Sequence, residues 1–334
     1  TLQFNHTFRV AGAADRDFTN IGILRIQSDK QVGYGEAAPS KFWSENLHMV
    51  QDAAAKINLD KHATPLVYEL ILREVKEEIN PPQALLAALD MALFDCIGKK
   101  MNIPVTRFLG LDNLNVPQTS FTIGFADLDV IQEKVELAKD FAILKLKLGT
   151  SYDIEIVEKV RSLTDKPIRV DANEGWEREE AAEKIKWLET QNVELVEQPL
   201  KSDRIEDTLW IKERVNMPII ADESVKDSSD IEKITGAFDG INIKLMKSGG
   251  ILEAIKMIRI ARQHQLKVMI GCMMESSLGI AAACNLQSMV DYVDLDSHLL
   301  MKNDPFQGLS LINGKIIRAG SAGLGVQPVA GLFE

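Results

Sequence analysis

The sequence has 334 residues, of which 46% are hydrophobic, and a formal net charge of −11. This is enough for one large domain and a second, smaller one. Because the chain is acidic and its basic residues are spread out, nucleic acid and anionic membranes are poor candidates for partners, and no apolar run is long enough to span a bilayer. Three cysteines lie in apolar segments, at Cys96, Cys272 and Cys284. They predict buried thiols in a reducing compartment, so we expect a cytoplasmic protein.

Residues 1–117 lack the regular rhythm of the part that follows. Alternating apolar residues predict three strands, at 4–10, 21–26 and 31–37. A small, polar segment at 11–19 lies between the first two, and we expect it to be mobile. Helical patterns follow at 45–58, 65–79 and 82–99. In the last pattern, large apolar residues recur at helical spacing and predict one buried face: Leu85, Leu89, Leu93 and Ile97.

From residue 118 onward, short apolar runs that end in polar residues alternate with helical segments, at a spacing of roughly 25 residues. Eight strands are predicted, at 118–125, 142–149, 167–176, 193–200, 218–224, 240–247, 267–275 and 292–297. Helices fit between them, at 127–140, 153–163, 179–190, 205–214, 229–235, 251–264 and 278–288. We therefore predict an α/β protein: a modified TIM barrel, (β/α)7β, over 118–303, preceded by an α+β capping domain over 1–117 that the tail 304–334 completes.

Three carboxylates end three successive predicted strands: Asp171, Glu197 and Asp222. Neighbouring strands lie about 5 Å apart, so these side chains can converge on one point. A carboxylate at such a position can also cap the helix that follows it, and one alone would carry no information. Three in consecutive units favour a site for a hard divalent cation, Mg²⁺ before Mn²⁺, because all the donors are oxygens.

Lysines occupy two other predicted strands. Lys145 and Lys147 alternate along the second strand and therefore point the same way, which we expect to be inward at the open end of the barrel. Lys244 lies on the sixth strand, with Asn242 on the same face. Strands two and six are diametrically opposed in a ring of eight. A single lysine at a strand end is often merely solvated, but a pair that faces a third across a metal site favours a functional role.

This arrangement suits the removal of a proton next to a carboxylate. The metal would bind the substrate carboxylate and hold the charge that develops on its oxygens. A lysine next to other cations has a lowered pKa, as we expect for Lys147 beside Lys145 and the metal. One lysine can then remove the proton while another returns it from the opposite side, which is racemisation or epimerisation.

Five segments, LKLKLG, RVDANEGW, VEQP, ADES and NIKLMKSGG, together resemble the enolase superfamily in its muconate-lactonising subgroup. The likeness covers nearly the whole chain, including GYGEAAP at 33–39 and the segment 88–110. It implies one Mg²⁺ per subunit, with Mn²⁺ as a possible substitute, held by Asp171, Glu197 and Asp222. It also implies that Lys147 and Lys244 are the acid/base pair and that Lys145 supports Lys147. The mandelate-racemase subgroup has a histidine at the end of strand seven, where this chain has methionines and a glutamate.

The eighth strand narrows the expected substrate. Asp294 and Asp296 are predicted to face inward, across the barrel from the metal, where they would attract an ammonium group. An N-cap before Ser297 is the alternative explanation. The dipeptide epimerases of the subgroup carry this Asp-x-Asp, so the resemblance implies epimerisation of a small dipeptide at its C-terminal residue. Thr122 and Asn173 are expected to line the same substrate pocket.

The resemblance also implies that side-chain specificity depends on the polar segment of the first domain, which carries Asp15, Arg16 and Asp17. Arg16 could pair with a side-chain carboxylate, as in the L-Ala-D/L-Glu dipeptide of cell-wall peptide, or could be an ordinary exposed arginine. We also expect a homo-oligomer. A cycloisomerase or o-succinylbenzoate synthase would use the same lysines and metal for β-elimination, but its anionic substrate gives Asp294 and Asp296 nothing to bind. A non-catalytic, metabolite-binding barrel is the third possibility, and the complete set of carboxylates and lysines argues against it.

Overall fold

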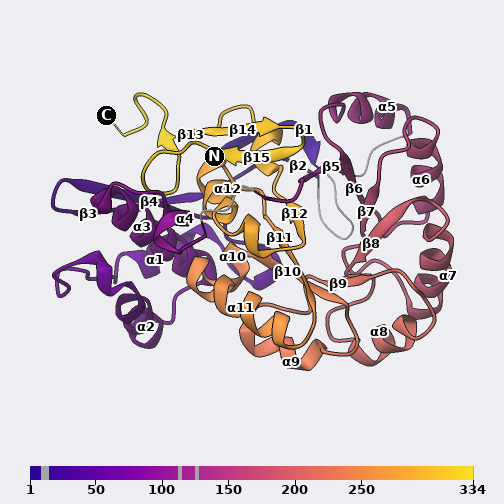
Figure 1. Ribbon diagram of the computed structural model, residues 1–334, viewed down its shortest axis with the longest axis horizontal. Coiled ribbons are helices and arrows are strands. Elements are labelled where there is room, and N and C mark those ends of the chain that lie inside the picture. Colours follow the sequence, from indigo (N-terminus) through magenta and orange to yellow (C-terminus); the bar gives the residue numbers. More distant parts are fainter. Residues whose placement is uncertain (9–14, 112–114, 125–127, 334) are drawn as a thin grey trace.

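The computed structural model describes residues 1–8, 15–111, 115–124 and 128–333, except for the side chains of 8, 128 and 129. Its centre is a parallel sheet of eight strands that neighbour one another in chain order (Figure 1). The strands are β5 (Ser120–Ile123), β6 (Ile143–Lys147), β7 (Ile168–Asp171), β8 (Val193–Glu197), β9 (Ile219–Ala221), β10 (Gly240–Lys244), β11 (Lys267–Gly271) and β12 (Tyr292–Asp294). A parallel bridge between Thr119 and Val293 joins β12 to β5 and closes the ring. The closed sheet confirms the predicted barrel.

Alternation along each strand separates the core from the interior of the barrel. In β6, Leu144 and Leu146 are fully buried under the outer helices, while Lys145 and Lys147 point into the barrel. The helices are α5 (Leu128–Leu137), α6 (Asp153–Arg161), α7 (Arg178–Leu188), α8 (Ile205–Lys212), α9 (Ile231–Ile234), α10 (Leu245–Ser248), α11 (Ile251–Gln263) and α12 (Ser277–Cys284). α10 is a correction, because the strand predicted at 240–247 ends at Lys244.

In its described residues, the N-terminal part combines two antiparallel strand pairs with four α-helices. Its strands are β1 (Leu2–Phe8), β2 (Arg16–Thr19), β3 (Gly22–Ser28) and β4 (Gln31–Ala37), and its helices are α1 (Leu47–Ala54), α2 (Tyr68–Ile79), α3 (Gln83–Met101) and α4 (Val105–Phe108). β2 was not predicted: the end of the segment expected to be polar and mobile pairs with β1, with Thr19 opposite Leu2. Residues 11–14 of that segment lie outside the described residues.

Helix α3 is the centre of the N-terminal part. The four residues predicted to be buried, Leu85, Leu89, Leu93 and Ile97, are buried. Every other residue from Ala84 to Gly98 is buried as well, so burial extends around the whole helix and is not limited to one face. The helix packs on β4 on one side and on α10 and α11 of the barrel on another. Gly33 and Gly35 of β4 allow this approach, since a Cβ at either position would collide with the α3 backbone. α3 therefore connects the N-terminal part to the barrel.

The tail packs back on the N-terminal part, as predicted. It forms β13 (Phe306–Gln307), β14 (Leu309–Ile312), β15 (Lys315–Arg318) and β16 (Gln327–Pro328). Leu324 N donates to Asp95 Oδ1 of α3 at 2.9 Å, and Gly323 bridges to Pro104. The exact domain boundaries at 117 and 303 remain a prediction.

Two further predictions concern the cysteines, expected to be buried thiols, and the apolar runs, expected to be too short to span a bilayer. All three cysteines are free thiols; Cys96 and Cys284 are buried, and Cys272 is half-buried. Across the described ranges, no helix has both the length and the apolar character needed to cross a membrane.

Candidate active site

Lys145 lies at the centre of the charged groups inside the barrel. It is 2% exposed, and three carboxylate oxygens surround its Nζ: Asp171 Oδ2 at 3.0 Å, Glu197 Oε2 at 2.6 Å and Asp294 Oδ2 at 2.7 Å. One ammonium group thus joins side chains from β7, β8 and β12. The structure therefore brings together residues that the sequence placed on three separate strands.

The predicted acid/base lysines lie on either side of this cluster. Lys147 Nζ is 2.6 Å from Asp171 Oδ2, and its side chain is 11% exposed at the open end of β6. Lys244 Nζ is 2.6 Å from Asp222 Oδ2. Since β6 and β10 are four strands apart in the ring, the two lysines face each other across the barrel interior.

Lys247 is a charged residue of the site that the sequence analysis missed. Its Nζ donates to Asp222 Oδ1 at 2.7 Å, to the Asp222 carbonyl at 2.7 Å and to the Asn242 carbonyl at 2.9 Å. Lys247 lies one helical turn after Lys244, so its spacing in NIKLMKSGG would have been the signal. It was overlooked because the segment was interpreted as a continuous strand.

The oxygen donors at the ends of β7, β8 and β9 fit a divalent cation. Asp171, Glu197 and Asp222 are all buried, and they accept hydrogen bonds from lysines. Two further buried oxygens, Asn173 Oδ1 and Glu223 Oε2, have no hydrogen-bond partner. Within the described ranges, no three acidic, histidine or cysteine side chains have the spacing of ligands around one metal ion. Lysine ammonium groups lie between the carboxylates, as Lys145 does between Asp171 and Glu197. An all-oxygen set with unbonded acceptors suits Mg²⁺.

Burial and charge shift the pKa values of the site in opposite directions. Burial, helped by the charge of Asp171, raises the pKa of the Glu197 carboxyl to about 7. For Asp222, burial is outweighed by Lys244 and Lys247, so its pKa is lowered. Burial alone would lower the pKa of Lys244, but the facing carboxylates of Asp222 and Glu197 raise it. This rise favours the ammonium form of Lys244, and a cation bound to those carboxylates would counteract it.

The Asp-x-Asp pair differs from its predicted geometry. Asp294 accepts from Lys145 Nζ at 2.7 Å and from Ser120 Oγ at 2.7 Å, so it adjoins the β7–β8 carboxylates instead of lying across the barrel from them. Asp296 lies just beyond β12 and accepts from Thr122 N at 2.5 Å. Its side chain makes no cap hydrogen bond to the helix η5 (Ser297–Leu300), which removes the N-cap explanation. Burial and the charge of Asp294 raise the pKa of Asp296 to about 7.

Two predicted substrate-binding residues remain, Asn173 and Arg16, and they lie in different parts of the structure. Asn173 has a positive φ of 43°, and its Nδ2 donates to Glu223 Oε1 at 3.3 Å, at the edge of the carboxylate group. Arg16 is exposed on β2. β1, the partner of β2, is tied to the segment after Asp296, since Lys302 N donates to the Gln3 carbonyl.

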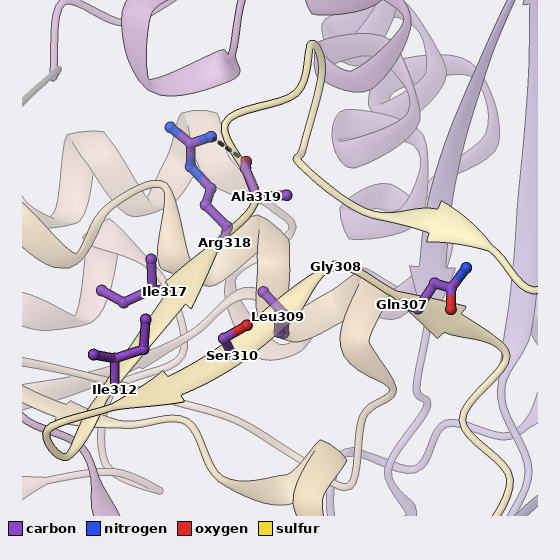
Figure 2. Close-up of a pocket in the computed structure, with 8 residues that line it drawn as sticks. All are labelled: Gln307, Gly308, Leu309, Ser310, Ile312, Ile317, Arg318 and Ala319. Carbon is purple, nitrogen blue, oxygen red and sulfur yellow. Dashed lines mark hydrogen bonds between the residues drawn. The ribbon is translucent and has the colours of Figure 1, made fainter.

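A pocket of about 440 Å³ lies elsewhere (Figure 2). β13, β14 and β15 line it, and the Arg318 guanidinium at its edge donates to the Ala319 carbonyl. The β14–β15 hairpin bonds to the start of β5, where Thr119 N donates to the Gly314 carbonyl at 2.8 Å. The pocket is therefore formed by the C-terminal tail, and none of the residues that line it is a lysine or a carboxylate of the site described above.

Comparison with known proteins agrees with this geometry. Residues 129–330 match the family model described as enolase C-terminal domain-like. The chain is 39% identical over 330 residues to the L-Ala-D/L-Glu epimerase of Bacteroides thetaiotaomicron, covering 98% of this chain and 86% of that protein. It is 38% identical to the hydrophobic dipeptide epimerase of a Flavobacteria bacterium, over 86% of this chain and 85% of that protein. The chain therefore belongs to the enolase C-terminal domain-like family.

Solved structures extend the comparison to the fold. The dipeptide epimerase from Cytophaga hutchinsonii, complexed with Mg and the dipeptide D-Ala-L-Val, superposes with a TM-score of 0.92 at 28% identity. It covers 99% of this chain, and this chain covers 94% of it. These relatives are isomerases that act on dipeptides, and they favour epimerisation over the β-elimination considered as the alternative.

Proposed function

We propose that this protein is a Mg²⁺-dependent dipeptide epimerase, which inverts the α-carbon of the C-terminal residue by 1,1-proton transfer through an enediolate. The observation that carries the proposal is the placement of Lys147 and Lys244 on opposite sides of the barrel, with the carboxylates of β7 to β9 between them. A planar intermediate between two lysines can receive a proton on either face. That is the requirement for epimerisation.

Asp171, Glu197 and Asp222 would hold the Mg²⁺. When bound, the ion supplies positive charge that stabilises the negative charge developing on the substrate carboxylate. The buried oxygen donors, together with the unbonded Asn173 Oδ1 and Glu223 Oε2, support this assignment.

The protein groups move the proton. One lysine, as the neutral amine, takes the α-proton, and the C–H electrons delocalise into the carboxylate. The other lysine, as the ammonium, gives a proton to the opposite face. Lys145, held by three carboxylates, fixes Asp171 and Glu197 and adds a positive charge next to Lys147.

The ammonium group of the dipeptide would bind to Asp296. The charge of Asp294 is already matched by Lys145, whereas Asp296 accepts only from Thr122 among the hydrogen bonds shown for its side chain. We assign Asp294 to holding Lys145, and Asp296, with Thr122, to the substrate. Arg16 on β2 is proposed to pair with the side-chain carboxylate of L-Ala-D/L-Glu, in a cytoplasmic, homo-oligomeric enzyme of cell-wall peptide metabolism.

The test is ¹H NMR of L-Ala-L-Glu in D₂O with the protein and Mg²⁺, beside a small library of other dipeptides. Loss of the glutamate α-proton signal with growth of an L-Ala-D-Glu signal is expected. Exchange only with hydrophobic or cationic dipeptides would keep the mechanism and remove the role of Arg16. No exchange with any dipeptide would contradict the proposed function.

A further inference from the structure

Each of the two strands that end in an acid/base lysine, β6 and β10, is followed by a segment bonded to a buried aspartate. In the hydrogen bonds that the structure shows, these aspartates bond neither to Lys147 or Lys244 nor to the metal-site carboxylates. Asp153, at the start of α6, is 3% exposed, and Asp90, in the middle of α3, is 0% exposed. Both accept hydrogen bonds from main-chain N–H groups of the segment that follows a lysine strand: the loop after β6 for Asp153, and the start of α11 for Asp90. The lysines and carboxylates of the active site give no reason for these two aspartates to be buried.

Asp153 connects the loop after β6 to the loop after β7. Its carboxylate accepts from Gly149 N at 3.1 Å and Thr150 N at 2.9 Å, which follow Lys147 closely in the chain. It also accepts from Trp176 Nε1 at 2.6 Å, in the loop after Asp171, and from Lys184 Nζ at 2.8 Å. One buried carboxylate thus holds together the two loops whose strands end in Lys147 and Asp171.

The backbones of these loops are in direct contact. A Cβ at Gly175 would lie 2.5 Å from Gly149 Cα, so the two loops approach more closely than any other residue type would permit. Without Asp153, Gly149 N, Thr150 N and the Trp176 indole would lose their acceptor. The loop after Lys147 would then be free to separate from the loop after Asp171.

Asp90 fixes the connection after β10 in a comparable way. Its Oδ1 accepts from Ile251 N at 2.6 Å and its Oδ2 from Leu252 N at 3.1 Å, which caps the thirteen-residue helix α11. The connection from Lys244 to Ile251 is short and contains α10 with Lys247. Its Gly250 has a φ of 120°, and a Cβ there would lie 2.5 Å from the Asp90 carboxyl group. The turn is therefore seated directly on α3.

We propose that Asp153 and Asp90 are positioning residues, Asp153 for Lys147 and Asp90 for Lys244. Each acts through the loop at the end of its strand and neither touches the substrate. The inference rests on the proposed two-lysine epimerisation. Because each lysine serves one face of the substrate α-carbon, loss of one aspartate must slow proton abstraction from one isomer more than from the other. A general loss of stability would reduce both rates equally, since it changes only the fraction of folded enzyme.

The experiment measures α-proton exchange in D₂O, by ¹H NMR, for each of the two epimeric dipeptides separately. Lys147→Ala and Lys244→Ala first assign each isomer to a lysine. Asp90→Ala should then slow exchange of the isomer assigned to Lys244 at least about tenfold relative to the other, because small displacements of a reacting group are costly. Asp153→Ala should shift the ratio in the opposite direction. Amide hydrogen exchange should show lost protection at Ile251 and Leu252 in the first variant, and at Gly149 and Thr150 in the second.

Asp95→Ala is the matched control. Asp95 lies on the same helix, is 1% exposed, and accepts from Tyr34 N and Leu324 N, away from the lysine loops. It should lower stability and leave the isomer ratio unchanged. Unchanged ratios in both test variants, or shifts in the same direction, would overturn the positioning roles while leaving the epimerase intact. Wild-type protein that exchanged neither isomer would contradict the proposed function, and this inference with it.

Discussion

At the scale of single residues, the arrangement of the site is set by Lys145, whose single ammonium group contacts three carboxylates. Lys145 neutralises part of the charge of Asp171, Glu197 and Asp294 at distances of 2.6–3.0 Å. The positions of Lys145 and of these carboxylates follow from strand alternation and could be predicted from the sequence. Their partners could not, because a pairing between β6 and β12 depends on the closure of the ring and on rotamers, which leave no pattern in the chain.

Lys145→Met should destabilise the metal-free protein by about 3–5 kcal/mol, because buried carboxylates lose their counter-charge. Mg²⁺ should then stabilise the variant more than it stabilises the wild type, since the ion supplies the missing positive charge. Thermal unfolding in EDTA and in excess Mg²⁺ measures both effects. Equal stabilisation of the two proteins by Mg²⁺ would show that Lys145 and the ion do not share these carboxylates.

Asp296→Asn should raise KM for a dipeptide roughly ten- to hundredfold, which corresponds to the loss of about 1.5–3 kcal/mol for a charged hydrogen bond. The effect should fall on KM more than on kcat, because Asp296 is proposed to bind the ammonium and not to move the proton. Steady-state kinetics with a free dipeptide and with its N-acetyl derivative is the measurement. If the variant lost the same factor with both substrates, the assignment of the ammonium to Asp296 would be wrong.

At the scale of secondary-structure elements, the departures from prediction occur where another element intervenes. The run 240–247 has the alternation of a strand, yet α10 begins at Leu245, where Met246 Sδ accepts from Ala38 N at 3.4 Å and Lys247 reaches Asp222. Similarly, Arg16–Thr19 is polar but forms β2 because β1 offers it a partner. Local sequence cannot encode either choice, since both depend on contacts between distant segments.

A second contact between distant segments, from Glu36 to Ser276, predicts how the stability of the fold depends on pH. Glu36 of β4 accepts from Ser276 N at 2.9 Å and from Ser276 Oγ at the start of α12, and burial, together with the charge of Glu275, raises its pKa to about 8. The ordinary value is 4.5, so the folded state holds a proton that the unfolded state releases. The stability that depends on Glu36 is therefore lost as the pH rises from about 4.5 to about 8.

Glu36→Gln removes this titration while keeping a hydrogen-bonding side chain. The stability of the variant relative to the wild type should increase between pH 5 and pH 8, by an amount on the order of a few kcal/mol. Urea unfolding at several pH values gives the difference directly. A pH-independent difference would mean that Glu36 is already ionised in the folded protein.

At the scale of the whole molecule, the repeat of strand and helix was sufficient to predict the barrel, because eight units of one period allow few other arrangements. The attachment of the N-terminal part was only partly predictable. The motif GYGEAAP indicated a strand, but not that its glycines would contact α3 or that its glutamate would bond to Ser276, the N-cap residue of α12. In the fold, α3 packs against α10 and α11, so the N-terminal part contacts the barrel next to the segment that follows Lys244.

The two-lysine mechanism is the central claim, and Lys244→Ala tests it most directly. With purified variant, Mg²⁺ and each epimeric dipeptide in D₂O, ¹H NMR should show no epimerisation, because the proton cannot be returned to one face. One isomer should still exchange its α-proton through Lys147, and thermal unfolding should show a folded protein. A Lys244→Ala enzyme that still interconverts the two isomers would contradict the account.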